Sequence, residues 1–255
     1  MRNQRRLQLA TVGLVAVITA TGCAPGAGSD AGGAGGGGAM TAPALVPSTS
    51  ARPTPPRVSA TPVPDRAPTV IPVSAFLALP EEMRFGRIRV PVEADRALPR
   101  LCGGEFTGGG VRAASAAVMS VYGLAGDPPG SIPHGVLYQT IRTYRGNGST
   151  TFMRHLRTEL ASCQSFTHEG VPYRIRTATL AGVGDEALTI DVSQPQTDLP
   201  GNPVGGTQTN RAVVIRIGDT VTVLWDAEYE RSSSKPEVVA DFARRAVDAI
   251  HAWRR

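Results

Sequence analysis

The sequence of 255 residues is poor in lysine, cysteine, aromatic residues and charge. It contains one lysine and three cysteines, aromatic residues make up 5% of it, and charged residues 18%. The formal net charge is +5, but three of the arginines belong to a leader that we expect to be removed. Without them 23 cationic side chains face 21 anionic ones, which leaves +2. So small an excess excludes the basic footprint of a nucleic-acid-binding protein.

Familiar catalytic signatures are also absent. The sequence holds no Gly-x-Ser-x-Gly elbow, no His-Glu-x-x-His pair and no phosphate-binding glycine loop. The four histidines are isolated, and His168-Glu169 alone offers a metal too few ligands. Asp185 and Glu186 are paired carboxylates, but adjacent side chains entering a strand point to opposite faces. We therefore expect no enzymatic activity, no metal and no cofactor.

Residues 1–22 have the organisation of a secretory signal peptide. Three arginines near the start precede the apolar stretch Leu7 to Thr21, which is too short to span a bilayer as a mature helix. The stretch ends in Ala20-Thr21-Gly22-Cys23, which resembles the lipobox of bacterial lipoproteins. The resemblance implies cleavage behind Gly22 and a diacylglycerol on the sulfur of Cys23, which would anchor the chain to a membrane. An ordinary secretory signal is the alternative, since the same small residues fit its cleavage site.

Residues 23–72 form the second predicted region, a disordered tether that starts at the lipidated cysteine. It consists mainly of Gly, Ala, Pro, Ser and Thr, and it includes the run Gly35 to Gly38. Such a composition cannot bury enough apolar surface to fold. The tether would hold the third region, a globular domain over residues 73–255, away from the membrane. Docking of its proline-rich part to a partner is the alternative to a plain linker.

The other two cysteines, Cys102 and Cys163, lie inside the expected domain. In an exported protein such a pair is typical of a disulfide. Two reduced thiols are the alternative. Cys163 ends a stretch in which Phe152, Leu156 and Leu160 recur at helical spacing, so we expect it on the buried face of a helix that starts near Ser149 or Thr150.

The pattern of apolar residues predicts an α+β domain. Ser74 to Met83 resembles a short helical entry, and a closing amphipathic helix should start with a capping box at Ser234. Gly218-Asp219 separates two alternating apolar runs and predicts a hairpin. We expect an antiparallel sheet of about six strands with helices packed on one face. The predicted strands are 111–122, 136–145, 173–178, 187–192, 211–217 and 220–229.

Several segments resemble the PknH-type extracellular sensor domain, which occurs on mycobacterial receptor kinases and on free-standing actinobacterial lipoproteins. The resemblance depends on the order and spacing of these segments and not on any one of them. The segments are Ser74-Ala75-Phe76-Leu77, Leu101-Cys102-Gly103-Gly104, Leu160-Ala161-Ser162-Cys163, Gly182-Val183-Gly184-Asp185-Glu186, Arg216-Ile217-Gly218-Asp219-Thr220 and the last helix. The resemblance implies a non-enzymatic ligand-sensing module with a cleft over its sheet. The sensor domains of the kinases carry two disulfides, whereas this domain has cysteines for one. The chain also lacks a kinase domain, so any signal must pass through a protein partner.

The alternation of side chains along the predicted strands suggests a ligand-binding surface. If Leu137, Ile141, Ile175, Ile215, Val223 and Trp225 point under the helices, the other face collects Tyr138, Arg142, Tyr144, Arg174, Arg176 and Arg216. Guanidinium groups bind carboxylate or phosphate, and tyrosine stacks while it donates a hydrogen bond. This face would suit an anionic or sugar-bearing fragment of the envelope; a merely solvated face is the alternative.

The sequence thus favours a membrane-anchored, extracytoplasmic module that senses or binds a ligand of the cell envelope. Two other classes stay open. A cell-envelope hydrolase would need a site that the sequence does not reveal, and a carrier of lipid or glycolipid would need a large apolar cavity.

Overall fold

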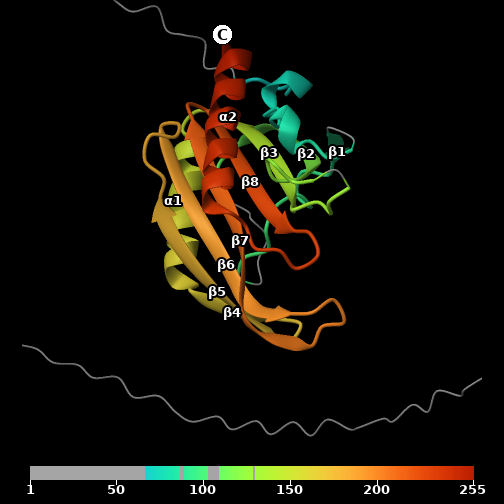
Figure 1. Ribbon diagram of the computed structural model, residues 1–255. Coiled ribbons are helices and arrows are strands. Elements are labelled where there is room, and N and C mark those ends of the chain that lie inside the picture. Colours follow the sequence, from blue (N-terminus) through green and yellow to red (C-terminus); the bar gives the residue numbers. More distant parts are fainter. Residues whose placement is uncertain (1–66, 87–88, 103–108, 129) are drawn as a thin grey trace, which may run out of the picture. The chain divides into compact units, whose positions relative to one another are not determined.

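The computed structural model describes residues 67–86, 89–102, 109–128 and 130–255. Cys23, the leader and nearly all of the tether lie outside the described residues. Within the described part, eight strands form one antiparallel sheet in the order β1-β2-β3-β8-β7-β6-β5-β4 (Figure 1). The strands are β1 (Val90–Val92), β2 (Arg112–Tyr122), β3 (Gly135–Tyr144), β4 (Ser165–His168), β5 (Val171–Thr179), β6 (Glu186–Thr197), β7 (Pro203–Ile217) and β8 (Thr220–Glu228).

All six predicted strands are present, and the sheet is larger than predicted by two strands. The two additional strands, β1 and β4, lie at the two edges and have three and four residues. Segments this short contain too few alternations of apolar and polar residues to be recognised in a sequence. The hairpin prediction at Gly218-Asp219 is confirmed, because Ile217 pairs with Thr220 across that turn.

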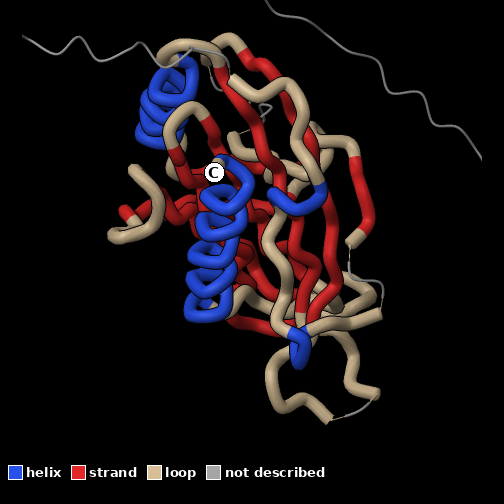
Figure 2. The backbone as a smooth tube through the Cα atoms, turned by 90° about the horizontal axis from the view of Figure 1, so that it is seen from above, coloured by secondary structure: helices blue, strands red, loops and turns tan. Residues whose placement is uncertain are grey.

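The two long helices are α1 (Gly148–Ser162) and α2 (Pro236–Arg254). The prediction that helices cover one face is wrong, since these two pack on opposite faces. Val213 and Ile215 of β7 lie in one cluster with residues of α2, whereas the alternate residues Ala212 and Val214 lie in another with residues of α1. Figure 2 shows the two helices, in blue, well separated from each other. The central strands are apolar on both faces, so both faces need a cover.

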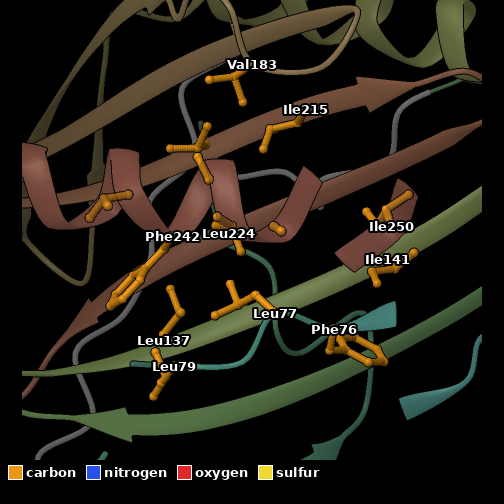
Figure 3. Close-up of a cluster of buried hydrophobic side chains, with 14 of the residues drawn as sticks. Phe76, Leu77, Leu79, Leu137, Ile141, Val183, Ile215, Leu224, Phe242 and Ile250 are labelled. Carbon is orange, nitrogen blue, oxygen red and sulfur yellow. The ribbon is translucent and has the colours of Figure 1, made fainter. Parts of the chain in front are cut away.

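The core on the α2 side is built from the middle of the sheet, helix α2 and the residues that lead into the domain. Phe242 and Ile250 of α2 are fully buried there, over Leu137, Ile141 and Leu224 of the sheet (Figure 3). Phe76 and Leu77 close the same cluster from the N-terminal side. Burying side chains of this size stabilises the fold by roughly 1.5–3 kcal/mol each.

The entry segment is not the helix that the sequence suggests. It contains two single turns of 3-10 helix, η1 (Val73–Ala75) and η2 (Glu81–Met83), with non-helical residues between them. The N–H of Leu77 donates to Oε1 of the buried Gln139 at 2.9 Å. Nε2 of Gln139 donates in turn to the Thr222 hydroxyl at 3.2 Å. The sheet thus satisfies a backbone donor that a helix would have used internally, and Pro80 stops a longer helix.

The core on the α1 side includes the disulfide between Cys102 and Cys163, whose Cα atoms are 6.0 Å apart. The predicted pairing is confirmed. Phe152, Leu156 and Leu160 are buried on one face of α1, as their spacing predicts, and Cys163 directly follows the helix. The bond therefore ties the segment before residue 103 to the end of α1.

The predicted helix starts are only partly correct. Helix α1 begins at Gly148, and the Ser149 hydroxyl donates to the Gly218 carbonyl at 2.7 Å, which fixes the helix to the β7–β8 turn. Helix α2 begins at Pro236 without a side-chain cap. The Ser234 hydroxyl instead accepts the N–H of Arg211 at 2.9 Å and donates to the Asp226 carbonyl at 3.2 Å. The capping box is absent because the sheet uses its serine.

Gly184 gives a first test of this packing. Its φ is +61°, and a Cβ there would lie 2.6 Å from Cγ2 of Ile215 and 2.7 Å from the Arg216 carbonyl oxygen. Gly184→Ala should lower the free energy of unfolding by about 3 kcal/mol, from the left-handed backbone and the clash together. Gly182→Ala is the matched control, since its φ is +73° but nothing lies within 4 Å, and about 1 kcal/mol is expected. Urea unfolding measures both; equal losses would contradict the packing around Gly184.

Candidate functional site

The six residues that alternation assigned to one surface lie on both faces of the sheet. Tyr138 pairs with Trp225, which pairs with Ala212 on the α1 side. Arg176 pairs with Asp191, which pairs with Arg211, the neighbour of Ala212. Since directly paired residues point to the same face and neighbours along a strand to opposite faces, the set divides. The α1 side holds Tyr138, Arg142, Tyr144 and Arg216, and the α2 side holds Arg174 and Arg176.

Arg142 and Tyr144 are buried, with 4% and 2% of their surface exposed. The Tyr144 ring packs against Phe152 of α1 at 5.7 Å between centroids. Nη2 of Arg142 donates to Oδ1 of Asp95 at 2.9 Å, and Nη1 of Arg112 donates to the same oxygen at 3.2 Å. Partial burial raises the pKa of Asp95, but the two guanidinium groups outweigh it and hold that pKa below its usual value. Arg142 therefore holds the segment around Asp95 against the sheet.

Arg216 is also engaged in holding the fold. Its Nη1 lies 3.0 Å from Oδ2 of Asp185 and its Nε 3.5 Å from Oε2 of Glu186. Asp185 also accepts the N–H of Gly218 at 2.7 Å, and Arg157 of α1 pairs with Glu186 at 2.7 Å. The two adjacent carboxylates thus lock the β7–β8 turn and the start of β6. Both contact the guanidinium group of Arg216, so the prediction that they point to opposite faces is wrong.

Arg174 and Arg176 are exposed on β5, on the side of the sheet that carries α2. Neither side chain makes a hydrogen bond or an ion pair with any described residue. The neighbour of Arg176 on β6, Asp191, is engaged elsewhere: Arg211 donates to its Oδ1 at 2.6 Å and to its Oδ2 at 2.8 Å. The carboxylate on the strand partner of Arg176 is thereby paired with Arg211, and two cationic side chains face solvent.

Hydroxyl groups surround these arginines. Ser165 of β4 and Ser193 of β6 are the partners of Arg174 on the two neighbouring strands. The Ser193 hydroxyl lies 2.8 Å from that of Thr209 on β7. Helix α2 packs on β7 and β8, so it leaves this part of β5 and β6 uncovered. We call the surface formed by Ser165, Arg174, Arg176, Ser193 and Thr209 the arginine–hydroxyl surface.

A buried acid next to this surface is a feature that sequence reasoning missed. Asp226 of β8 is 1% exposed, and its Oδ1 accepts the Tyr122 hydroxyl at 2.8 Å. Burial raises the pKa of Asp226 to about 6, against the opposing effects of Ser234, Tyr122 and Arg211. Burial likewise raises the pKa of Tyr122. The signal in the sequence is an aspartate that directly follows the apolar run Val221 to Trp225.

With Asp226 included, charges alternate across four adjacent strands on one face. The row runs Asp226 on β8, Arg211 on β7, Asp191 on β6 and Arg176 on β5. Its first member is buried and its last is exposed. Opposite charges directly across a sheet stabilise the pairing of strands, so the row fixes the register of these four strands.

A small open hollow of about 310 Å³ lies between the last turns of α1 and strands β5 and β6. Its walls are Arg157, Leu160, Ala161, Thr177, Ala178, Thr179 and Leu188. The described residues include no group of three or more His, Cys, Asp or Glu placed to hold a metal ion. Likewise, no helix in the described part is long and apolar enough to cross a membrane.

No protein-family model and no curated protein matches this sequence. Among solved structures, the chain is similar to the extracellular domain of PknH from Mycobacterium tuberculosis, with a TM-score of 0.35 and 14% sequence identity. The similarity covers 54% of this chain and 64% of that one, so this chain spans less than two thirds of that domain. A similarity of this degree supports no statement about activity or ligand.

Proposed function

We propose that the chain is a lipoprotein, anchored through Cys23 to the outer face of a cell membrane, whose folded domain binds a ligand of the cell envelope. The observation that carries the proposal is the disulfide between Cys102 and Cys163. Such bonds persist in oxidising compartments outside the cytoplasm. The leader and the lipobox-like Ala20-Thr21-Gly22-Cys23 support the same location, and they add the anchor.

The domain acts by binding rather than by catalysis. Two of the residues that the sequence singled out, Arg174 and Arg176, are exposed and have no partner in the described structure, which suits the capture of a ligand. The hydrogen-bonded pair that most resembles acid–base machinery, Tyr122 and Asp226, is buried in the sheet, where a substrate cannot reach it. Any signal from the bound ligand passes to a protein partner.

The lipid anchor makes a direct prediction about detergent partitioning. The mature full-length protein should enter the detergent phase of a phase-separating detergent, and Cys23→Ala should move it to the aqueous phase. The Cys102→Ser/Cys163→Ser double variant is the matched control, since it loses both domain sulfurs but keeps Cys23, and it should stay in the detergent phase. A Cys23→Ala protein that has lost residues 1–22 and still partitions into detergent would show that the lipobox assignment is wrong.

A further inference from the structure

We propose that the arginine–hydroxyl surface on β4, β5, β6 and β7 binds a carboxylate or phosphate group of a hydroxyl-rich envelope polymer. This inference deepens the proposed function, on which it rests, by naming the site and the class of ligand. It differs from the surface that strand alternation predicts, because only Arg174 and Arg176 of those six residues belong to it.

The charge at this surface favours an anion. Arg211 donates to both carboxylate oxygens of Asp191, so the strand partner of Arg176 on β6 is already engaged in an ion pair. Arg174 has serines as its partners on both neighbouring strands. The side chains of Arg174 and Arg176 therefore form no ion pair with a described residue, and the rise of a strand places the Cα atoms of these two residues about 7 Å apart on one face.

The side chains around the arginines leave space for a ligand. Ala178 lies two residues beyond Arg176 on the same face and is exposed, and Thr189 is its partner on β6. Because the side chains of Ala178 and Thr189 are small, a ligand can approach the backbone of the sheet and still contact the guanidinium groups of the two longer arginine side chains. Guanidinium binds carboxylate and phosphate in a bidentate manner.

The hydroxyl groups define the rest of the ligand. The Ser193 and Thr209 hydroxyls already form one hydrogen bond with each other, and each oxygen keeps a further lone pair for an incoming group. Ser165 is exposed on the other side of Arg174. A polymer that carries both hydroxyl groups and anionic groups satisfies the arginines and the serines together, whereas a bare lipid headgroup satisfies mainly the arginines.

The test is a titration of the full-length protein in detergent with three soluble polymers: oligogalacturonate, poly(glycerol phosphate) and neutral dextran. We expect one or both anionic polymers to bind and dextran not to bind. Arg174→Gln/Arg176→Gln should weaken binding by roughly tenfold or more, as expected when one charge-assisted hydrogen bond is lost. The arm that binds distinguishes a carboxylate from a phosphate ligand.

The matched control is a double variant that removes two positive charges from helix α2 instead. Arg244 and Arg245 are exposed and already paired with Asp241, so Arg244→Gln/Arg245→Gln should leave the affinity within about twofold. Equal losses in the two double variants, or no binding by the unmodified protein, would overturn the proposal. So would binding of the Cys23→Ala protein, which lacks the lipid anchor, to phosphatidylglycerol vesicles that exceeds its binding to both polymers. Detergent partitioning of the Cys23 variant tests the anchor separately, so either proposal can fail alone.

Discussion

Reduction of the disulfide between Cys102 and Cys163, or its replacement by two serines, is expected to lower the free energy of unfolding by about 4 kcal/mol. The bond joins residues 61 positions apart, and closing a loop of that length removes much of the conformational entropy of the unfolded chain. Both cysteines are half-buried, so two serines should fit without a large further loss. The loss should appear in urea unfolding as a lower midpoint for Cys102→Ser/Cys163→Ser.

Two comparisons make this result specific. Reductant should destabilise the unmodified protein to the level of the double variant and leave the variant itself unchanged. Cys23→Ala should unfold at the same urea concentration as the unmodified protein, because we expect Cys23 to belong to the tether and not to the domain. If reductant has no effect on the unmodified protein and mass measurement finds two free thiols, the disulfide and the location inferred from it are both wrong.

Replacement of Asp226 by asparagine is expected to stabilise the domain above pH 6 and to have little effect near pH 4. Burial raises the pKa of this carboxyl to about 6 in the folded protein, from an ordinary value of 3.8. The folded state therefore holds the proton more tightly than the unfolded state. The stability that comes from the protonated carboxyl is complete below pH 3.8 and is lost as the pH rises through 6.

A difference of about two pKa units corresponds to about 3 kcal/mol. Asparagine is neutral at every pH and still accepts the Tyr122 hydroxyl through Oδ1. The difference in unfolding free energy between variant and unmodified protein should therefore grow from near zero at pH 4 to about 3 kcal/mol at pH 8. Urea unfolding at a series of pH values measures it, and taking the difference cancels the titration of all other groups.

Tyr122→Phe should change the stability in the opposite direction to Asp226→Asn. Removing the hydroxyl takes away the donor to Oδ1 of the buried carboxylate, so this variant should lose most stability above pH 6, where Asp226 is ionised. A difference between Asp226→Asn and the unmodified protein that stays constant with pH would mean that the carboxyl keeps an ordinary pKa, and that the burial of Asp226 has no electrostatic cost.

Much of the local structure was predictable from the sequence because it depends on short-range patterns. Phe152, Leu156 and Leu160 lie on one face of α1 as their spacing predicts, and Gly218 with Asp219 forms the expected hairpin turn. The edge strands β1 and β4 were missed because they are short. The disulfide was predictable because a domain with two cysteines that is expected to be exported has one way to pair them.

The candidate site was less predictable because it depends on which face of the sheet each strand presents. Alternation places Arg142 with Tyr138 correctly, but it cannot show that residues around Asp95 cover Arg142. Nor does it show whether Arg176 of β5 shares a face with Arg142 of β3. Whether the two arginines share a face depends on how β3 pairs with β8, β8 with β7, β7 with β6, and β6 with β5. Pairings between residues far apart in the sequence determine these registers.

The dependence on distant pairings also explains why the prediction of a capping box at Ser234 and the prediction that helices cover one face were wrong. The Ser234 hydroxyl was assigned to the start of α2, yet it bonds to Arg211 and Asp226, which lie on neighbouring strands. A local motif cannot reveal such competition. The division of the helices between two faces was visible in β7, whose residues Ala212 to Ile215 are all apolar, a pattern typical of a strand covered on both sides.

The most direct test of the central claim is to label intact cells with an amine-reactive reagent that does not cross membranes. The chain contains one lysine, Lys235, which is half-buried just before α2, so Lys235→Arg is a control that removes the only reactive side chain of the domain. The account predicts that the membrane-bound protein is labelled at Lys235 as fully in intact cells as after lysis, and that Lys235→Arg is not labelled there. Labelling of Lys235 only after lysis would place the domain inside the cell and contradict the account.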